Sequence, residues 1–375
     1  MCEYLTMRRV ESWDEVAGRI QEARVASGLT QAELAGHLGI DRTALVRIEA
    51  GQRQVSAMEL FKLSEVLGVS PSHFVTRPPA AVVSQRQTLV EGADAASRTR
   101  FQFDAALEAH ARDTSWLIEE GLLPRVKTPS PPKVKDEKGA RKLAEDVRRQ
   151  AELGTEPIGS MAELAERFGL YMLTLDQDVE GASLLLDGFG VAVLGGQREP
   201  GRRRFTAAHE LGHHLLQDPY HTDIGVAASA QEREALIDAF AANLLLPPTA
   251  LTSGPRDGNP RERLIGLAGT YRVSWSVVVS AAERAKLFTH GELVRLRAET
   301  PVKGEFLAVL GEEPRPDLLK GRTGPGWRRA VLAAYERSLI TADRTIELLN
   351  GELAKDDLPP QSPQLDGLRK GKRSR

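Results

Sequence analysis

Near the start of the chain, apolar residues recur among polar ones with the period of a helix. Residues 13–75 fall into five apolar stretches at helical spacing, separated by glycines and capping residues. Thr30 with Glu33, and Ser56 with Glu59, have the spacing of a capping box, in which the side chains bond backbone amides at the start of a helix. The pattern therefore predicts an N-terminal domain of five helices.

The pattern changes after the segment 126–135, which combines prolines with basic residues and predicts an exposed linker. Helical spacing returns over residues 139–153 and 160–168. A Gly-Phe-Gly tip predicts a hairpin after them, and the rest of the chain has mainly helical spacing. The expected fold class is α+β, mainly α with a small antiparallel sheet. The strands of that sheet are predicted at residues 171–175, 183–187 and 190–194.

Composition narrows the classes of function. The chain has 375 residues, which predicts two or three domains, and a formal net charge of −2, so any binding to DNA has to rest on a local surface. No apolar run reaches the roughly 18 residues of a transmembrane helix, and a single cysteine excludes an internal disulfide. We therefore expect a cytoplasmic protein with no membrane partner.

The clearest chemical signal is the string His209-Glu210-Leu211-Gly212-His213, which follows Thr206, a suitable N-cap residue. Residues four apart lie on one face of a helix, so both imidazoles can reach one ion. Glu210 lies about 100° around the helix axis from His209. It is therefore placed beside the coordination position that stays open for water, where it can act as a general base. The string predicts a zinc-dependent hydrolase in which His209 and His213 are metal ligands.

A catalytic zinc needs a third protein ligand. The metzincin spacing is excluded, because its glycine and histidine positions hold Leu216 and Pro219. Glu234 is the preferred ligand, since Asp238 follows one helical turn later and can hydrogen-bond a ligating histidine. Glu232 is the alternative, and the two glutamates point in different directions from one helix, so both cannot serve one ion. The order of Glu-x-x-x-Asp after His-Glu-x-x-His resembles the gluzincin arrangement.

Two longer blocks carry a resemblance to a known family. The first is RRFTAAHELGHH at residues 203–214, and the second joins Glu234 to DAFAANLLLP at residues 238–247. With the helix and hairpin before them, they resemble the ImmA/IrrE family of metallopeptidases over residues 138–290. The methionine usual before the proline of the second block is replaced by Leu246. The resemblance implies zinc-dependent cleavage of a peptide bond, usually in a helix-turn-helix repressor whose removal turns on stress, mobile-element or defence genes.

The N-terminal helices resemble a second family. The order of Gln31, Gly39, a helix over residues 41–50 and Gly51 is similar to that of the XRE, or lambda-repressor-like, helix-turn-helix family. In such domains the third helix reads the major groove, where arginine bonds guanine edges and threonine contacts thymine methyls or phosphates. A glutamine at the start of the second helix anchors a phosphate or a base edge. The candidate DNA contacts are Gln31, Arg42, Thr43 and Arg47.

Other residues of this domain are expected to stabilise its fold and not to contact DNA. In the same register Leu45 and Ile48 face the core. Arg24 and Glu49 occupy positions that form a partly buried ion pair in this family, so their charges do not count toward DNA. The alternative for the domain is five helices used for protein contacts alone. Such domains also dimerise, so a homodimer is an alternative assembly for this chain.

We divide the chain into five parts on these grounds. Residues 13–78 are expected to form the DNA-binding domain, 79–137 a helical segment with the linker, and 138–300 the gluzincin-like zinc peptidase domain. Residues 301–357 form a helical region without an assigned role, and 358–375 a disordered basic tail.

The expected function is that of a DNA-binding regulator with zinc-dependent endopeptidase activity. Its cofactor is Zn²⁺, and its partners are a double-stranded DNA operator and a protein substrate. That substrate is a helix-turn-helix repressor, an antitoxin, or the chain's own linker. The alternative is a non-proteolytic regulator or antitoxin with a structural or inactive metal site. Glu210 argues against this alternative, because a purely structural site does not require it.

Overall fold

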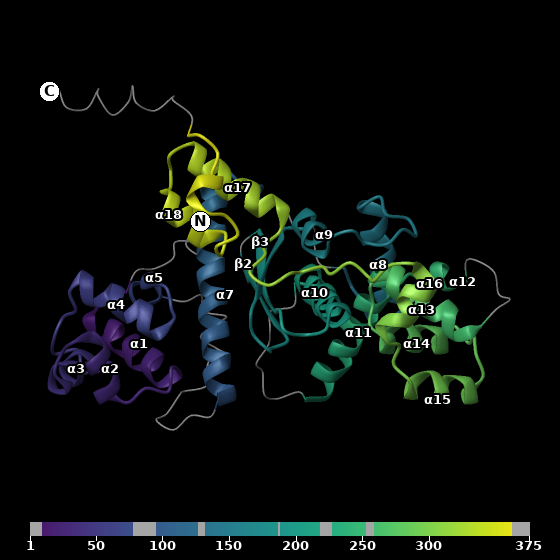
Figure 1. Cartoon of the computed structure of the whole chain (residues 1–375), viewed down its shortest axis with the longest axis horizontal. Coiled ribbons are helices and arrows are strands. Elements are labelled where there is room, and N and C mark those ends of the chain that lie inside the picture. The colour runs from purple at the N-terminus through teal and green to yellow at the C-terminus, as the bar shows by residue number, and fades with distance from the viewer. Residues whose placement is uncertain are drawn as a thin grey trace. The chain divides into compact units, whose positions relative to one another are not determined.

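The computed structural model describes residues 10–77, 95–126, 132–186, 188–217, 227–252 and 259–361. It is mainly helical with a small sheet, which confirms the α+β class. The chain divides into two compact units, Met1–Trp116 and Leu117–Arg375, called unit 1 and unit 2 (Figure 1). Residues 127–131 of the predicted linker and 362–375 of the predicted tail lie outside the described residues.

Unit 1 contains the five short helices that the apolar pattern predicts. Both capping boxes are present, because Thr30 and Ser56 accept hydrogen bonds from the amides of Glu33 and Glu59, whose carboxylates bond back. Asp41 has the extended backbone of an N-cap, although its side chain makes no capping hydrogen bond. The helices are α1 (Trp13–Ala26), α2 (Gln31–Leu38), α3 (Arg42–Glu49), α4 (Ala57–Leu67) and α5 (Pro71–Val75).

A long helix, α7 (Ala95–Glu119), follows the five short helices. Its residues Phe101 and Ala105 are buried in the same apolar cluster as the cores of α1 to α4. The carboxylate of Glu108 lies 3.2 Å from the guanidinium of Arg19 on α1, and both side chains are buried. The N-terminal unit therefore includes most of α7 in addition to the five helices.

Unit 2 holds a three-stranded sheet in the order β1-β3-β2. The strands are β1 (Leu170–Leu175), β2 (Gly181–Leu186) and β3 (Phe189–Gly195). β2 and β3 form the expected antiparallel hairpin, but β1 pairs with β3 in parallel. The sheet is therefore mixed, and the expectation of a wholly antiparallel sheet is corrected. All seven residues of β3 are buried, which suits the central position and leaves β2 at an edge.

The C-terminal region covers the other edge of the sheet. The amide of Thr174 on β1 donates to the carbonyl of Arg322 at 3.0 Å, and the amide of Gly321 donates to the carbonyl of Thr174 at 2.7 Å. The carboxylate of Asp317 accepts a hydrogen bond from Arg204, whose side chain is buried. The region that had no assigned role therefore packs as part of unit 2.

The helices of unit 2 are α8 (Glu137–Gln150), α9 (Met161–Arg167), α10 (Pro200–Leu215), α11 (Ala227–Leu245), α12 (Pro248–Thr252), α13 (Pro260–Tyr271), α14 (Trp275–Arg284), α15 (His290–Ala298), α16 (Lys303–Leu310), α17 (Pro325–Glu336) and α18 (Ala342–Leu348), followed by a short 3-10 helix at Lys355–Asp357. Among them, α9 and α10 pack against the sheet, and most of the others lie beyond them (Figure 1).

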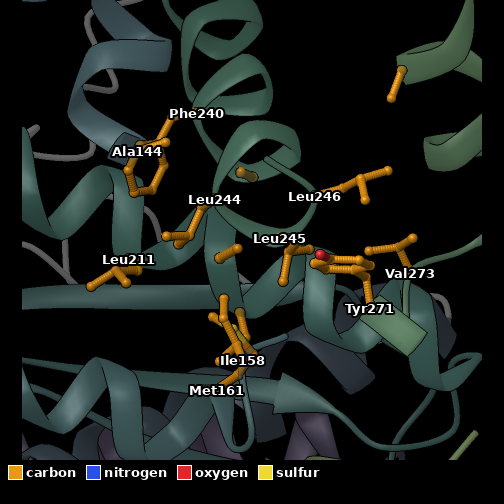
Figure 2. Close-up of a cluster of buried hydrophobic side chains, with 14 of the residues drawn as sticks. Ala144, Ile158, Met161, Leu211, Phe240, Leu244, Leu245, Leu246, Tyr271 and Val273 are labelled. Carbon is orange, nitrogen blue, oxygen red and sulfur yellow. The ribbon is translucent and has the colours of Figure 1, made fainter. Parts of the chain in front are cut away.

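The core of unit 2 fixes α10 against α11. Leu211 of α10 and Phe240 and Leu244 of α11 belong to one buried apolar cluster (Figure 2). A Cβ atom at Gly212 would lie 2.9 Å from the Phe240 ring and 3.0 Å from a methyl carbon of Ile237. A side chain at position 212 would therefore push the helices apart, and glycine allows their close approach.

A helix that spans a membrane must be long and mainly apolar. No single described helix combines the necessary length and apolar composition. One bent pair, Pro260–Tyr271 with Trp275–Arg284, meets the criterion by length and composition alone.

Candidate metal centre and DNA-binding helix

Helix α10 carries two histidines on one face. Ala207, Ala208 and Leu211 on the same helix are fully buried in the core of unit 2 and fix its rotation. His209 and His213 are four residues apart, so they point the same way, and their Nε2 atoms lie 3.0 Å apart. His213 is buried, whereas His209 is partly open to solvent.

The third group of this centre comes from α11. The carboxylate of Glu234 lies 3.2 Å from His209 Nε2 and 3.7 Å from His213 Nε2. The ligand atoms that these three residues offer all lie within 4.8 Å of one another, close enough to bind one ion. Glu232, the alternative, is exposed and is not part of this group. Of the two candidate glutamates, the structure brings Glu234 to the histidines.

Hydrogen bonding and burial act on the two imidazoles. Asp238 lies 2.9 Å from His209 Nδ1, so its carboxylate orients the ring with Nε2 toward His213 and Glu234. Burial lowers the pKa of His209, but the hydrogen bond to Asp238 and the nearby carboxylates outweigh it, and the net pKa is raised. Burial, followed by the charge of His209, lowers the pKa of His213 to about 3.

Glu210 is buried beside the histidines and contacts β2. The hydroxyl of Ser183 donates to its Oε2 atom. A Cβ atom at Gly181 would lie 2.6 Å from a methyl carbon of Thr206 and 3.0 Å from Glu210 Oε1, so glycine lets β2 approach α10 this closely. Sequence analysis missed Ser183 and Gly181. No local pattern marks either residue, because the contact of Ser183 with Glu210 joins positions 27 apart in the chain.

These side chains line a cleft in unit 2 with a volume of about 680 Å³. This volume falls in the range of about 300–1,000 Å³ that is usual for ligand sites. One wall is formed by the start of β2, and another by Ser274, Ser276 and Val277 at the start of α14. Because β2 is an edge strand, the cleft adjoins backbone groups that an extended peptide can pair with.

The donor chemistry of the centre fits a zinc ion. Two imidazole nitrogens and one carboxylate oxygen form a common ligand set of catalytic zinc, which keeps a further position open for water. Zinc-ligating histidines usually bond a carboxylate through their second nitrogen, and Asp238 supplies that bond to His209. Glu210 stands next to this set without belonging to it.

In unit 1, helix α3 has the buried and exposed faces expected of a recognition helix. Leu45 and Ile48 are buried in the core. Arg42, Thr43 and Arg47 are exposed, so their side chains are accessible to a ligand of unit 1.

A buried charge cluster lies behind this helix. Arg24 Nε lies 2.6 Å from the Glu49 carboxylate, and both side chains are almost wholly buried, which confirms the expected ion pair. The side-chain amide of Gln31 also donates to Glu49, at 2.8 Å. Gln31 therefore stabilises the domain from within, in addition to its predicted role at DNA.

Comparison with protein families identifies two domains in the chain. Residues 20–74 match the family described as helix-turn-helix, and residues 165–283 match the family described as IrrE N-terminal-like domain. The chain joins a helix-turn-helix domain to an IrrE N-terminal-like domain. Both predicted resemblances are confirmed, and the match places the IrrE-like domain in a metallopeptidase family. The matched residues include His209, His213 and Glu234, and Glu210 beside them. No curated protein matches the chain.

Proposed function

We propose that the chain is a DNA-binding regulator whose IrrE-like domain is a zinc-dependent endopeptidase. One observation carries the proposal: His209, His213 and Glu234 offer their ligand atoms within 4.8 Å of one another, from two helices, inside a cleft. Glu210 lines the same cleft. A structural zinc site is closed and needs no such neighbour, whereas a hydrolytic site needs a general base.

Each side chain has a role in the proposed mechanism. Bound zinc supplies Lewis acidity, which polarises a peptide carbonyl and makes water more acidic. His209, His213 and Glu234 hold the ion, and Asp238 orients His209. Glu210 accepts a proton from water and returns it to the departing amine. Ser183 is a positioning residue, because its hydroxyl bonds Oε2 of Glu210 and restricts the rotation of that carboxylate.

The sheet offers the substrate one edge. β1 is covered by the backbone of Gly321 and Arg322, whereas β2 is an edge strand and lines the cleft at Gly181. A peptide added alongside β2 gains main-chain hydrogen bonds independent of its sequence. The proposed substrate segment is therefore an extended one.

The proposed substrate class is a helix-turn-helix repressor or an antitoxin, and the alternative substrate is the chain's own linker. Purified full-length chain, loaded with Zn²⁺ and mixed with candidate repressors, is expected to produce discrete fragments in mass spectrometry. A chelator should stop their formation, because it removes the zinc that acts as the Lewis acid, and added zinc should restore it. Fragments that form equally fast with the chelator present would refute the proposal.

We also propose that α3 reads a double-stranded operator through Arg42, Thr43 and Arg47, with Gln31 at the start of α2. Arg42→Ala and Arg47→Ala are each expected to weaken specific binding by about 1–3 kcal/mol, because each removes contacts to base edges. Binding isotherms on the operator and on random DNA measure the effect. Lys62→Ala, an exposed change on α4, is the control and should have little effect on specificity. Equal losses on operator and random DNA would rule out base readout.

A further inference from the structure

A second pocket adjoins the metal cleft, between α11 and α14. It has a volume of about 450 Å³. Several residues line both the pocket and the cleft, so the two lie side by side. A peptide that lies at the metal ligands can therefore place one side chain in the pocket. The shared residues are Phe205, Asp238, Ser276 and Val277.

Small residues on α11 provide the space in this pocket. Ala235, Ala239 and Ala242 follow one another at intervals of four and three residues, so they lie on one face of the helix. An alanine side chain ends at Cβ, and three of them leave room that longer side chains would fill. Phe205 and Val277 add apolar surface and pack against the core of unit 2.

The charged residues that line the pocket already face partners. Asp238 is 2.9 Å from His209 Nδ1, and Arg284 Nε is 3.9 Å from the Glu137 carboxylate. Asp238, Arg284 and Glu137 are partly exposed and two of them are acidic, so a substrate carboxylate would meet more repulsion than attraction. An apolar side chain gains free energy from burial in the pocket.

We propose that this pocket binds an apolar side chain of the peptide substrate close to the cleaved bond, and so sets the sequence preference of the enzyme. The inference rests on the proposed peptidase function. A hydrophobic pocket discriminates about 10–200-fold for one methylene, so leucine should be preferred over alanine at this subsite by at least about 10-fold. Aspartate should be rejected more strongly, because two of the three charged residues that line the pocket are acidic.

The first test uses zinc-loaded, full-length chain and a mixture of end-blocked random decapeptides, with cleavage sites read by mass spectrometry. Ala239→Leu fills the pocket and should reduce the leucine-to-alanine preference to about 3-fold or less. Ala298→Leu, an exposed change on α15 outside the pocket, is the matched control and should keep the preference. Val277→Ala enlarges the pocket and should shift the preference toward phenylalanine. Metal content and circular dichroism check that each variant is folded and loaded.

The second test measures binding without cleavage. Glu210→Gln chain is titrated with pairs of fluorescent decapeptides that carry leucine or alanine at each position in turn, and anisotropy reports the dissociation constants. Tighter binding of a leucine peptide than of its alanine counterpart, lost when Ala239→Leu is added, supports the pocket. If the parent cleaves nothing, this result still supports the pocket, and the proposed function alone fails. Cleavage without apolar preference, or a preference that Ala239→Leu leaves intact, overturns the pocket and leaves the peptidase function standing. Equal binding of both peptides in every pair by a chain that cleaves nothing overturns both.

Discussion

Replacing Glu210 with glutamine is expected to slow repressor cleavage by about 10²–10⁴-fold, the usual contribution of a general base. Glutamine keeps the size of the side chain and can still accept a hydrogen bond from Ser183, but it cannot take a proton from water. Since Glu210 is outside the ligand set, zinc content should be unchanged. Steady-state cleavage rates and metal analysis of the same samples measure both effects.

The matched control for this variant is Glu199→Gln. Glu199 lines the same cleft and is exposed, but it does not belong to the ligand set. Its variant should cleave at nearly the parental rate. A Glu210→Gln chain that cuts as fast as the parent would remove Glu210 from the chemistry, whatever its metal content. A chain that binds zinc tightly but cuts no repressor, with or without the substitution, would favour the non-proteolytic alternative.

Replacing Glu234 with alanine is expected to weaken zinc binding by more than about 100-fold, because even the outer hydrogen-bonding partners of a zinc site contribute about 10–100-fold. The variant keeps both histidines on α10, so a weak two-nitrogen site remains. Competition with a fluorescent chelator measures the affinity. Repressor cleavage should fall in parallel when zinc is limiting.

Glu232→Ala separates the two candidate ligands. Glu232 is on the same helix and exposed like Glu234, but it does not join the group formed with the histidines. Zinc affinity should therefore be close to that of the parent. The reverse result, with zinc lost in Glu232→Ala and retained in Glu234→Ala, would show that α11 presents a different carboxylate to the ion.

The local parts of the fold follow closely from the sequence. Helix boundaries in unit 1 were predictable because capping boxes such as Thr30 with Glu33 are formed by residues three apart. The pairing of His209 with His213 follows from the helical repeat alone. The approach of Glu234 to the two histidines was predictable because Asp238 one turn later fits the outer hydrogen bond of a zinc-ligating histidine.

Long-range contacts account for what the sequence did not predict. An alternating pattern of apolar and polar residues does not determine the order of strands in a sheet. β3 is buried throughout and lies between the other two strands, where β1 pairs with it in parallel. Ser183 reaches Glu210 only because Gly181 allows β2 close to α10. Arg204 and Asp317 are 113 residues apart, so their contact left no local signal. The C-terminal region therefore had no predicted role, although it packs against β1 and α10.

The position of zinc in crystals of the full-length chain, located by anomalous scattering at the zinc absorption edge, tests the central claim most directly. We expect one ion bonded to Nε2 of His209, Nε2 of His213 and the Glu234 carboxylate, at about 2.0–2.2 Å from each. We also expect a solvent-facing coordination position on the side of Glu210. Zinc held by other residues, or an active crystal form with no zinc between α10 and α11, would contradict the central claim.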